Sequence, residues 1–272
     1  MDNNIHNPVN YKPFKIIDTH AHLGFTKAMY IPGNPNIDGL ISTMDRVGID
    51  RIFIAPHLAI SCDFISGNQL ALDAAQQYPD RVIALATVNI NYNSQYLMEL
   101  GKCFKNPLFK GIKLHPDFLG YSIRDSRFND IFQFASDNGV FIISHTDARV
   151  TPNHLIKFSD PAWFEPYLEK FKNVDVVFAH CGLTPDGFEE SLRLSLLYSN
   201  CYLDTTGFRF SDTWTIEEIV CKNGSKKLLF GSDMPYNDAT SALGRVLYAN
   251  ISDEDKNNIL YKNALEILQK RR

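Results

Sequence analysis

The chain has 272 residues, of which 44% are hydrophobic and 21% charged, a composition typical of a soluble globular protein with one sizeable core. The formal net charge of -4 and the sequence pI near 6.1 give no electrostatic reason to expect nucleic acid or an anionic membrane as a partner. We therefore expect a small-molecule substrate, and a homo-oligomer is compatible with the sequence.

The cysteines and the N-terminal residues indicate the compartment. The five cysteines are widely spaced and include no C-x-x-C pair, so neither a disulfide framework nor a zinc ribbon is indicated. The opening MDNNIHNPVN lacks the apolar region of a signal peptide, and no apolar run approaches the length of a membrane span. These features predict a cytoplasmic protein without a membrane segment.

Eight short apolar runs, rich in β-branched residues, alternate with longer segments of helical period. Their continuous hydrophobicity predicts strands that are covered on both faces, as in a parallel sheet. The runs are KIIDTHAH (15–22), RIFIAPH (51–57), RVIALATVN (81–89), GIKLHP (111–116), VFIISHT (140–146), VDVVFAHCG (174–182), CYLDTTG (201–207) and KLLFGSDMP (227–235).

The segments between these runs predict helices. In DGLISTMDRVG, Asp38 is the expected N-cap and Gly48 the C-terminal stop. Residues 126–139 and 161–171 show the same helical period, and the final segment opens with a capping box at Ser252 and predicts one closing helix. Residues 147–161 have no clear period and are expected to form a long loop after the fifth strand.

Eight strand-and-helix units in about 250 residues match the size of a (β/α)8 barrel. We therefore predict an α/β fold in which residues 1–272 form a single metal-dependent barrel domain. A doubly wound open sheet is the alternative. Such sheets usually bind nucleotides through a Gly-rich first turn, whereas the first strand here runs into HAHLGF instead of G-x-G-x-x-G.

Histidines gather where the predicted strands end. Strand ends of a parallel barrel meet at one face, so these residues should converge there. Neutral imidazoles with a carboxylate form a site for zinc or a similar divalent ion, and the spacing of HAH lets one strand supply two ligands. The residues in these positions are His20, His22, His57, His115, His145, His180 and Asp233.

The pieces IIDTHAHLG, GIKLHP, IISHT, VFAHCG, YLDTTG, LLFGSDMP and YKNALEIL resemble the amidohydrolase superfamily, in particular its amidohydrolase-related (amidohydrolase 2) branch of metal-dependent TIM-barrel hydrolases. The resemblance implies that His20, His22 and His145 bind the metal. It further implies that Asp233 is both ligand and proton shuttle, and that His180 binds a second metal or acts on the substrate. Zinc is the expected ion, with one ion favoured over two.

Four further residues have two interpretations each. Lys113 lies on the strand where binuclear members of the superfamily carry a bridging carboxylated lysine, but it precedes His115 by two residues and could instead pair with Asp18 or another carboxylate. His115 is expected to face the substrate or to support the ligands. Asp18 shares the face of His20 and is expected to support the ligands or only to pack, and Asp204 is a weaker candidate of the same kind.

The predicted reaction is hydrolysis of an amide, lactone or other ester bond of a small molecule through a metal-activated water. A metal-dependent decarboxylase of an aromatic or unsaturated carboxylic acid is the alternative, because the same branch contains such lyases. A barrel that keeps the metal only for stability or ligand binding is a third interpretation. Four arginines in the loops would suit a carboxylate-bearing substrate, although solvated loop charges are the favoured interpretation: Arg124, Arg127, Arg149 and Arg209.

Overall fold

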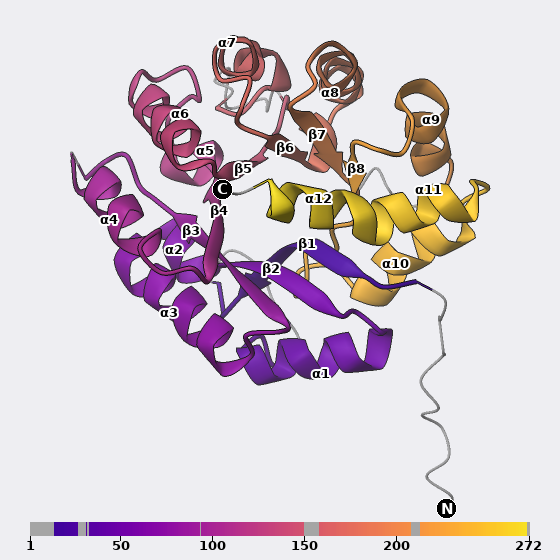
Figure 1. Ribbon diagram of the computed structural model, residues 1–272, viewed down its shortest axis with the longest axis horizontal. Coiled ribbons are helices and arrows are strands. Elements are labelled where there is room, and N and C mark those ends of the chain that lie inside the picture. The colour runs from indigo at the N-terminus through magenta and orange to yellow at the C-terminus, as the bar shows by residue number, and fades with distance from the viewer. Residues whose placement is uncertain are drawn as a thin grey trace, which may run out of the picture.

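The computed structural model describes residues 14–26, 31, 33–92, 94–149, 158–207 and 213–270. Eight parallel strands follow one another in chain order around a barrel (Figure 1). The predicted single-domain (β/α)8 fold is confirmed, and the doubly wound alternative is wrong because no strand order reverses. The strands are β1 (Ile17–Leu23), β2 (Arg51–Pro56), β3 (Val82–Thr87), β4 (Phe109–Leu114), β5 (Phe141–His145), β6 (Val176–Ala179), β7 (Cys201–Asp204) and β8 (Leu228–Leu229).

Helices connect the strands and surround the sheet (Figure 1). The helical elements are α1 (Ile37–Val47), α2 (His57–Ser61), α3 (Phe64–Gln77), α4 (Gln95–Cys103), α5 (Pro116–Leu119), α6 (Arg127–Asn138), η1 (Pro161–Phe164), α7 (Glu165–Lys170), η2 (His180–Gly182), α8 (Pro185–Leu197), α9 (Trp214–Asn223), α10 (Ala239–Tyr248), α11 (Asp253–Asn257), η4 (Asn258–Lys262) and α12 (Asn263–Gln269). Of the loop predicted at 147–161, residues 150–157 lie outside the described residues.

One predicted helix start and the continuity of the closing helix differ from the structure. Asn36 rather than Asp38 is the N-cap of α1, since the Asn36 side chain accepts from Gly39 N at 3.4 Å. Asn and Asp cap equally well, so the sequence could not choose between them. Ser252 is the predicted N-cap of α11, but the closing helix is not uniform, because the π-helical turn η4 lies between α11 and α12.

The seam between β8 and β1 brings two parts of the predicted site together. The regular strand β8 has only two residues, yet the chain beyond it continues beside β1. Asp233 N donates to His20 O at 2.8 Å, and His22 N donates to Met234 O at 2.8 Å. Asp233 is therefore tied by backbone hydrogen bonds to the strand that carries the two histidines.

One end of the barrel interior is filled with hydrophobic side chains. Ile17, Phe53 and Phe141 belong to this inner cluster, which Ala264 and Ile267 of α12 complete. In Figure 1, α12 crosses the barrel near its centre. Because α12 and the inner cluster close this end, the site must lie at the opposite end, where the strands terminate.

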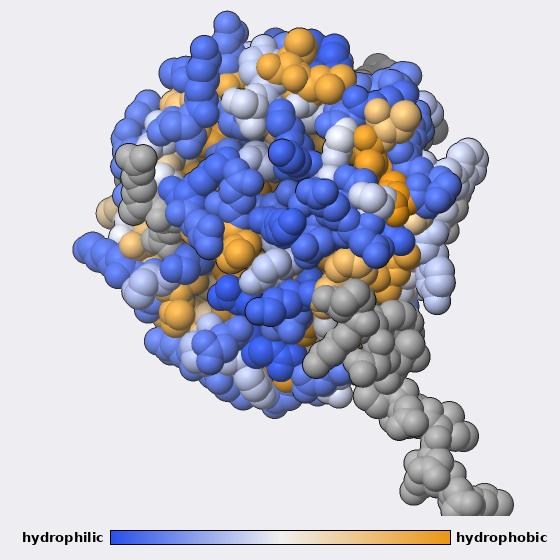
Figure 2. All heavy atoms as spheres, turned by 45° about the vertical axis from the view of Figure 1, so that its right-hand side comes forward, coloured by the Kyte–Doolittle hydropathy of each residue, from blue (hydrophilic) through white to orange (hydrophobic). Residues whose placement is uncertain are grey.

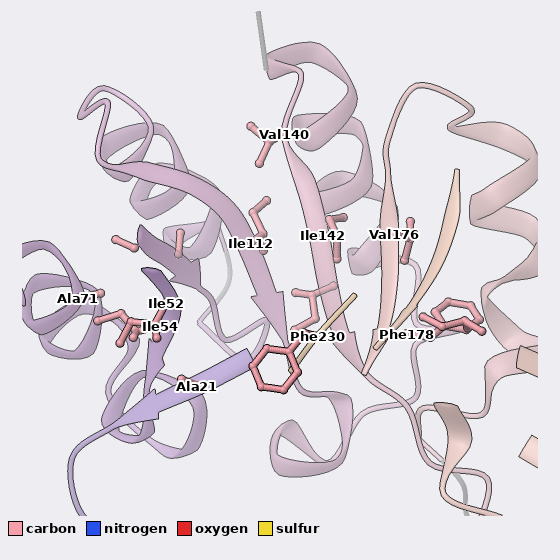
Figure 3. Close-up of a cluster of buried hydrophobic side chains, with 14 of the residues drawn as sticks. Ala21, Ile52, Ile54, Ala71, Ile112, Val140, Ile142, Val176, Phe178 and Phe230 are labelled. Atoms are coloured by element: carbon pink, nitrogen blue, oxygen red, sulfur yellow. The ribbon is translucent and has the colours of Figure 1, made fainter. Parts of the chain in front are cut away.

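A second hydrophobic layer lies between the strands and the outer helices. Figure 3 shows its side chains on neighbouring strands, among them Ile52, Ile112, Ile142 and Val176. Both faces of the strands are therefore buried, which explains why their sequences are continuously apolar.

The outer surface is mostly polar. Figure 2 shows one face that is largely hydrophilic, with scattered hydrophobic side chains. Within the described part of the chain, no helix has the length and hydrophobicity needed to cross a bilayer.

Asn263→Ala should destabilise the barrel seam. The buried Asn263 side chain donates to Ser225 O and Leu228 O, both at 2.7 Å, so its loss leaves buried carbonyls without these partners. We expect a loss of about 1–3 kcal/mol in the free energy of unfolding, measured by urea denaturation. The exposed Asn138→Ala is the control and should change it by less than about 0.5 kcal/mol. Equal effects of the two substitutions would contradict the prediction.

Candidate metal centre

Six buried or half-buried imidazoles form a continuous array at the ends of the strands. Neighbouring ring centroids are 5.2 Å apart for His57 and His22, 5.2 Å for His22 and His20, and 4.9 Å for His20 and His180. The array continues from His180 to His145 at 4.9 Å and from His145 to His115 at 4.0 Å. The predicted convergence of these histidines on one end of the barrel is therefore present.

Hydrogen bonds fix the tautomers of His20 and His22. His20 Nδ1 lies 2.8 Å from Asp204 Oδ2, and His22 Nδ1 lies 3.0 Å from Ala55 O. A carboxylate and a carbonyl only accept, so each Nδ1 carries the proton. Burial lowers the pKa of His20, which keeps the ring neutral and leaves its Nε2 with a free lone pair.

The Nε2 atoms of His20 and His22 and a carboxylate oxygen of Asp233 face one another. The Nε2 atoms are 3.3 Å apart, and Asp233 Oδ1 lies 3.3 Å from His22 Nε2 and 3.6 Å from His20 Nε2. Three potential ligand atoms therefore converge on one position. A tetrahedral ion about 2.1 Å from each ligand separates its ligands by about 3.4 Å, so these residues fit a divalent metal.

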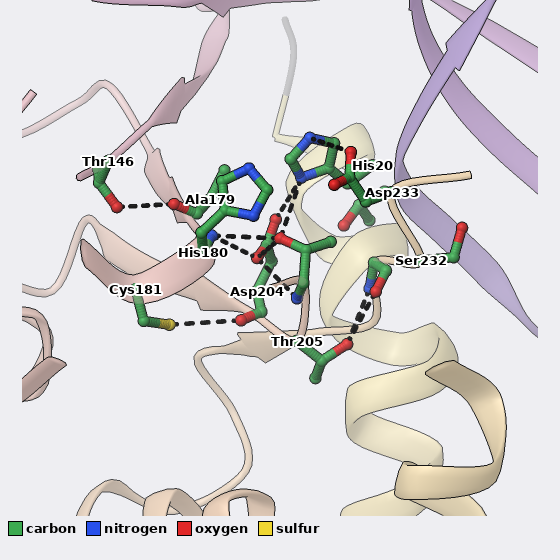
Figure 4. A network of polar contacts seen from close by, with 12 residues as sticks. His20, Thr146, Ala179, His180, Cys181, Asp204, Thr205, Ser232 and Asp233 are labelled. Carbon is green, nitrogen blue, oxygen red and sulfur yellow. Dashed lines mark hydrogen bonds and ion pairs between the residues drawn. The ribbon is translucent and has the colours of Figure 1, made fainter. Parts of the chain in front are cut away.

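Asp204 supports this arrangement from beneath (Figure 4). Its Oδ2 accepts from His20, while its Oδ1 accepts from the backbone N of His180 and of Thr206, both at 3.0 Å. Burial raises the pKa of Asp204, but hydrogen bonding and charge attraction from His20 outweigh it and lower the pKa to about 2. A carboxylate behind a histidine is the usual support of a metal-binding imidazole. The sequence predicted this role only weakly.

The two carboxylate oxygens of Asp233 have different neighbours. Oδ1 faces the imidazoles, and Asn237 Nδ2 donates to Oδ2 at 3.1 Å. Asp233 and His180 have positive φ angles of 64° and 67°. This conformation costs a residue other than glycine about 1–3 kcal/mol and tends to occur where the surrounding structure imposes a functional geometry.

Asp18 differs from the expected position. The register shifts between Asp18 and Ala21; Ile17 packs in the inner cluster and Ala21 in the outer one, so the alternation of side chains reverses within β1. The expectation that Asp18 shares one uninterrupted row with His20 is therefore wrong. Asp18 accepts from Ser232 N at 3.0 Å and Ser232 Oγ at 2.5 Å, which anchors the residue next to Asp233.

Lys113 contacts His20 rather than Asp18. Its Nζ lies 2.8 Å from His20 Nε2, and the side chain is only 2% exposed. Burial lowers the pKa of this lysine to about 8, although Asp204 and Asp233 oppose the shift. The lysine thus places a cationic group at the edge of the candidate metal centre.

His180 lies beside His20, and its ring belongs with His20 and Asp233 to one group of potential ligands. Burial lowers the pKa of His180 to about 4, so the ring is neutral at neutral pH, and its Nδ1 is buried without a hydrogen-bond partner among the described residues. His145 lies one ring further along the array, and its assignment as a ligand stays a prediction.

A second group of potential ligands contains His115, Asp117 and His145. The rings of His115 and His145 are stacked 4.0 Å apart and within 9° of parallel. Lone pairs of imidazole lie in the ring plane, so parallel stacked rings cannot both point at one ion. As it stands, the group is unsuited to a metal. Phe118 packs on His115 with a centroid distance of 4.1 Å and a tilt of 34°, so the three rings form a stack with His115 in its middle.

Some site residues carried no clear signal in the sequence. Asp117 Oδ2 lies 3.6 Å from His145 Nε2, and burial raises the pKa of this carboxyl to about 6. Tyr236 OH lies 2.6 Å from His57 Nδ1. Both follow a predicted site residue by two or three positions, and this proximity in sequence was the only available indication.

The loop arginines are engaged with neighbouring groups. Arg127 pairs with Asp125 at 2.8 Å, and Arg149 pairs with Asp147 at 2.5 Å. Arg124 lies over the ring of Trp163. Arg209, the fourth of these arginines, lies outside the described residues.

A (β/α)8 barrel with a His and Asp cluster at the ends of its strands defines a class of metal-dependent enzymes. Comparison with known proteins identifies the family. The amidohydrolase family model matches residues 17–270, and the chain belongs to this family. The predicted resemblance is confirmed. A search of curated proteins by sequence gave no match.

Solved structures agree on the fold. A 2,6-dihydroxybenzoate decarboxylase complexed with 2,6-dihydroxybenzoate matches with a TM-score of 0.76 at 14% identity, covering 94% of this chain and 99% of its own. A dihydroxybenzoic acid decarboxylase from Polaromonas sp. JS666, with bound manganese and 2-nitroresorcinol, matches with a TM-score of 0.73 at 15% identity, covering 95% and 98%. A probable 2-pyrone-4,6-dicarboxylic acid hydrolase from Acinetobacter baumannii matches with a TM-score of 0.67 at 21% identity, covering 94% and 100%.

Asp204→Asn should weaken metal binding without unfolding the protein. The substitution removes the charge that holds His20 and makes its Nε2 a poorer ligand, so we expect the Kd for Zn²⁺ to rise about 10–100-fold. The measurement is a titration against a competing chelator. Asp175→Asn is the control, because Asp175 pairs with Lys270 near the C-terminus instead of with a site residue. An unchanged Kd in Asp204→Asn would contradict the assigned support.

Asp18 should give the metal-free protein a distinct pH dependence. Burial raises the pKa of Asp18 to about 7. The unfolded chain releases this proton near pH 4, whereas the folded chain keeps it until about pH 7, so this carboxyl lowers the free energy of unfolding as the pH rises between these values. Urea denaturation across this range should show a loss in wild type that is smaller in Asp18→Asn. A constant difference between the two would refute the assignment.

Proposed function

We propose that the protein is a metal-dependent hydrolase that cleaves an amide, lactone or other ester bond of a small molecule. The observation that supports this proposal is the convergence of His20 Nε2, His22 Nε2 and Asp233 Oδ1 within 3.3–3.6 Å of one another. We further propose zinc as the ion, because neutral imidazoles with one carboxylate at tetrahedral spacing suit it. We expect one ion per chain, since the second group of histidines is stacked.

When bound, a divalent ion supplies Lewis acidity, which activates water and polarises a carbonyl oxygen. We assign proton transfer and hydrogen bonding to the reacting group to the side chains of Asp233 and His180. Asp233 has its Oδ2 fixed by Asn237, so its Oδ1 is oriented to take a proton from water and return it to the leaving group. His180 is neutral, so it can offer a hydrogen bond or a lone pair to the reacting group rather than a full positive charge.

Decarboxylation of an aromatic or unsaturated carboxylic acid is the second candidate, because two observations favour it. Two of the structural neighbours are decarboxylases of dihydroxybenzoic acids. The partly exposed ring of Phe118, at the end of the stack with His115 and His145, offers an aromatic contact for a planar substrate. In either reaction we propose a small-molecule substrate, with no nucleic acid or membrane partner, in the cytoplasm.

Asp233→Asn should abolish turnover and leave the fold intact. The amide cannot take up the proton, so we expect kcat to fall by about 10²–10⁴-fold, with an unchanged far-UV circular dichroism spectrum. Asp238→Asn is the matched control, because Asp238 caps α10 and Asn caps a helix equally well. The assay uses a panel of lactones, amides and aromatic acids on zinc- and manganese-loaded enzyme. Acid release without carbon dioxide supports hydrolysis, whereas carbon dioxide release selects the decarboxylase; undiminished turnover in Asp233→Asn would overturn both.

A further inference from the structure

Lys113 is the one fully buried lysine or arginine among the described residues, and it reaches the candidate metal centre. Its Nζ is 2.8 Å from His20 Nε2. Since His20 Nδ1 already donates to Asp204, the Nε2 atom has no proton and must accept from the ammonium group. This hydrogen bond is charge-assisted and fully buried, and such bonds are about twice as strong as neutral ones.

The same lone pair of His20 is needed by the metal. An imidazole nitrogen has a single lone pair in the ring plane, so it can accept a hydrogen bond from lysine or bind a metal ion, but not both at full strength. We propose that Lys113 competes with the metal for His20 Nε2 and thereby weakens the affinity of the site. The inference rests on the proposed metal-dependent function and concerns how that metal is held.

The surroundings explain why the lysine occupies this position. Lys113 lies in the regular part of β4, paired in register with Thr87 of β3 and Ile143 of β5, so its stem is fixed inside the barrel. The carboxylates of Asp204 and Asp233 attract its charge. The ammonium group therefore compensates buried negative charge in the metal-free protein, and an incoming divalent ion must take over that role.

A carboxylated Lys113 that bridges two ions, the alternative raised by the sequence, predicts the opposite effect of a substitution. Removal of a bridging ligand weakens metal binding and reduces the number of ions bound. Removal of a competitor strengthens binding at an unchanged stoichiometry. The sign of the change in Kd therefore separates the two roles without any measurement of turnover.

The experiment is a titration of metal-free protein with Zn²⁺ against a competing chelator at fixed pH, with bound metal counted by elemental analysis. Lys113→Met keeps an unbranched side chain, one atom shorter and without the charge, and we expect the Kd to fall at least about tenfold, the size of a charge-assisted hydrogen bond. Lys113→Gln retains a neutral donor and should bind with intermediate affinity. Lys222→Met, which removes a surface charge paired with Glu218, is the control and should match wild type.

The change in the Kd for Zn²⁺ decides between the possible roles of Lys113. Tighter binding in Lys113→Met, with a native circular dichroism spectrum, supports the competitor; should that variant not fold, Lys113→Gln decides by the same sign. An equal or weaker affinity overturns the inference while wild-type metal binding leaves the proposed function standing. Absence of metal binding in wild type overturns the proposed function as well.

Discussion

The candidate metal centre depends on the hydrogen bonds that fix the tautomers of His20 and His22. His20 Nδ1 donates to Asp204 Oδ2, and His22 Nδ1 donates to Ala55 O. The Nε2 atoms of both rings face Asp233. These three atoms, 3.3–3.6 Å apart, attract a cation, and the Lys113 ammonium lies 2.8 Å from His20 Nε2. The supporting hydrogen bonds therefore orient the three atoms toward one another, as a metal site requires, and the strands hold them in that arrangement.

The barrel makes this arrangement rigid. The short strand β8 would be a weak point in the sheet, yet the residues after it are hydrogen-bonded to β1 on both sides of Asp233. Asp18 adds a buried anchor for Ser232. Backbone strain at Asp233 and His180 is thus held in place by contacts outside the metal centre itself.

Charge balance connects the site to the interior of the barrel. Asp204 and Asp233 are carboxylates in a region of neutral imidazoles, and Lys113 is the nearby cation. A competitor of this kind would keep the unloaded site stable and make loading depend on the supply of metal. The stacked rings of Phe118, His115 and His145 lie at the other end of the imidazole array.

Much of this protein could be predicted from the sequence, because continuous apolar strands, helical periods between them and histidines at strand ends follow from local chemistry. These patterns predicted the barrel and the convergence of the HAH pair with Asp233, and the resemblance of the motifs predicted the family. The reversal of alternation at Asp18, the contact of Lys113 with His20 and the stacking of His115 on His145 could not be predicted, because each depends on a register shift or on side chains from distant strands. The sequence by itself determined which groups reach the mouth of the barrel. Only the tertiary structure decided which atoms face one another, because tautomers and distances are set by neighbours that lie far apart along the chain.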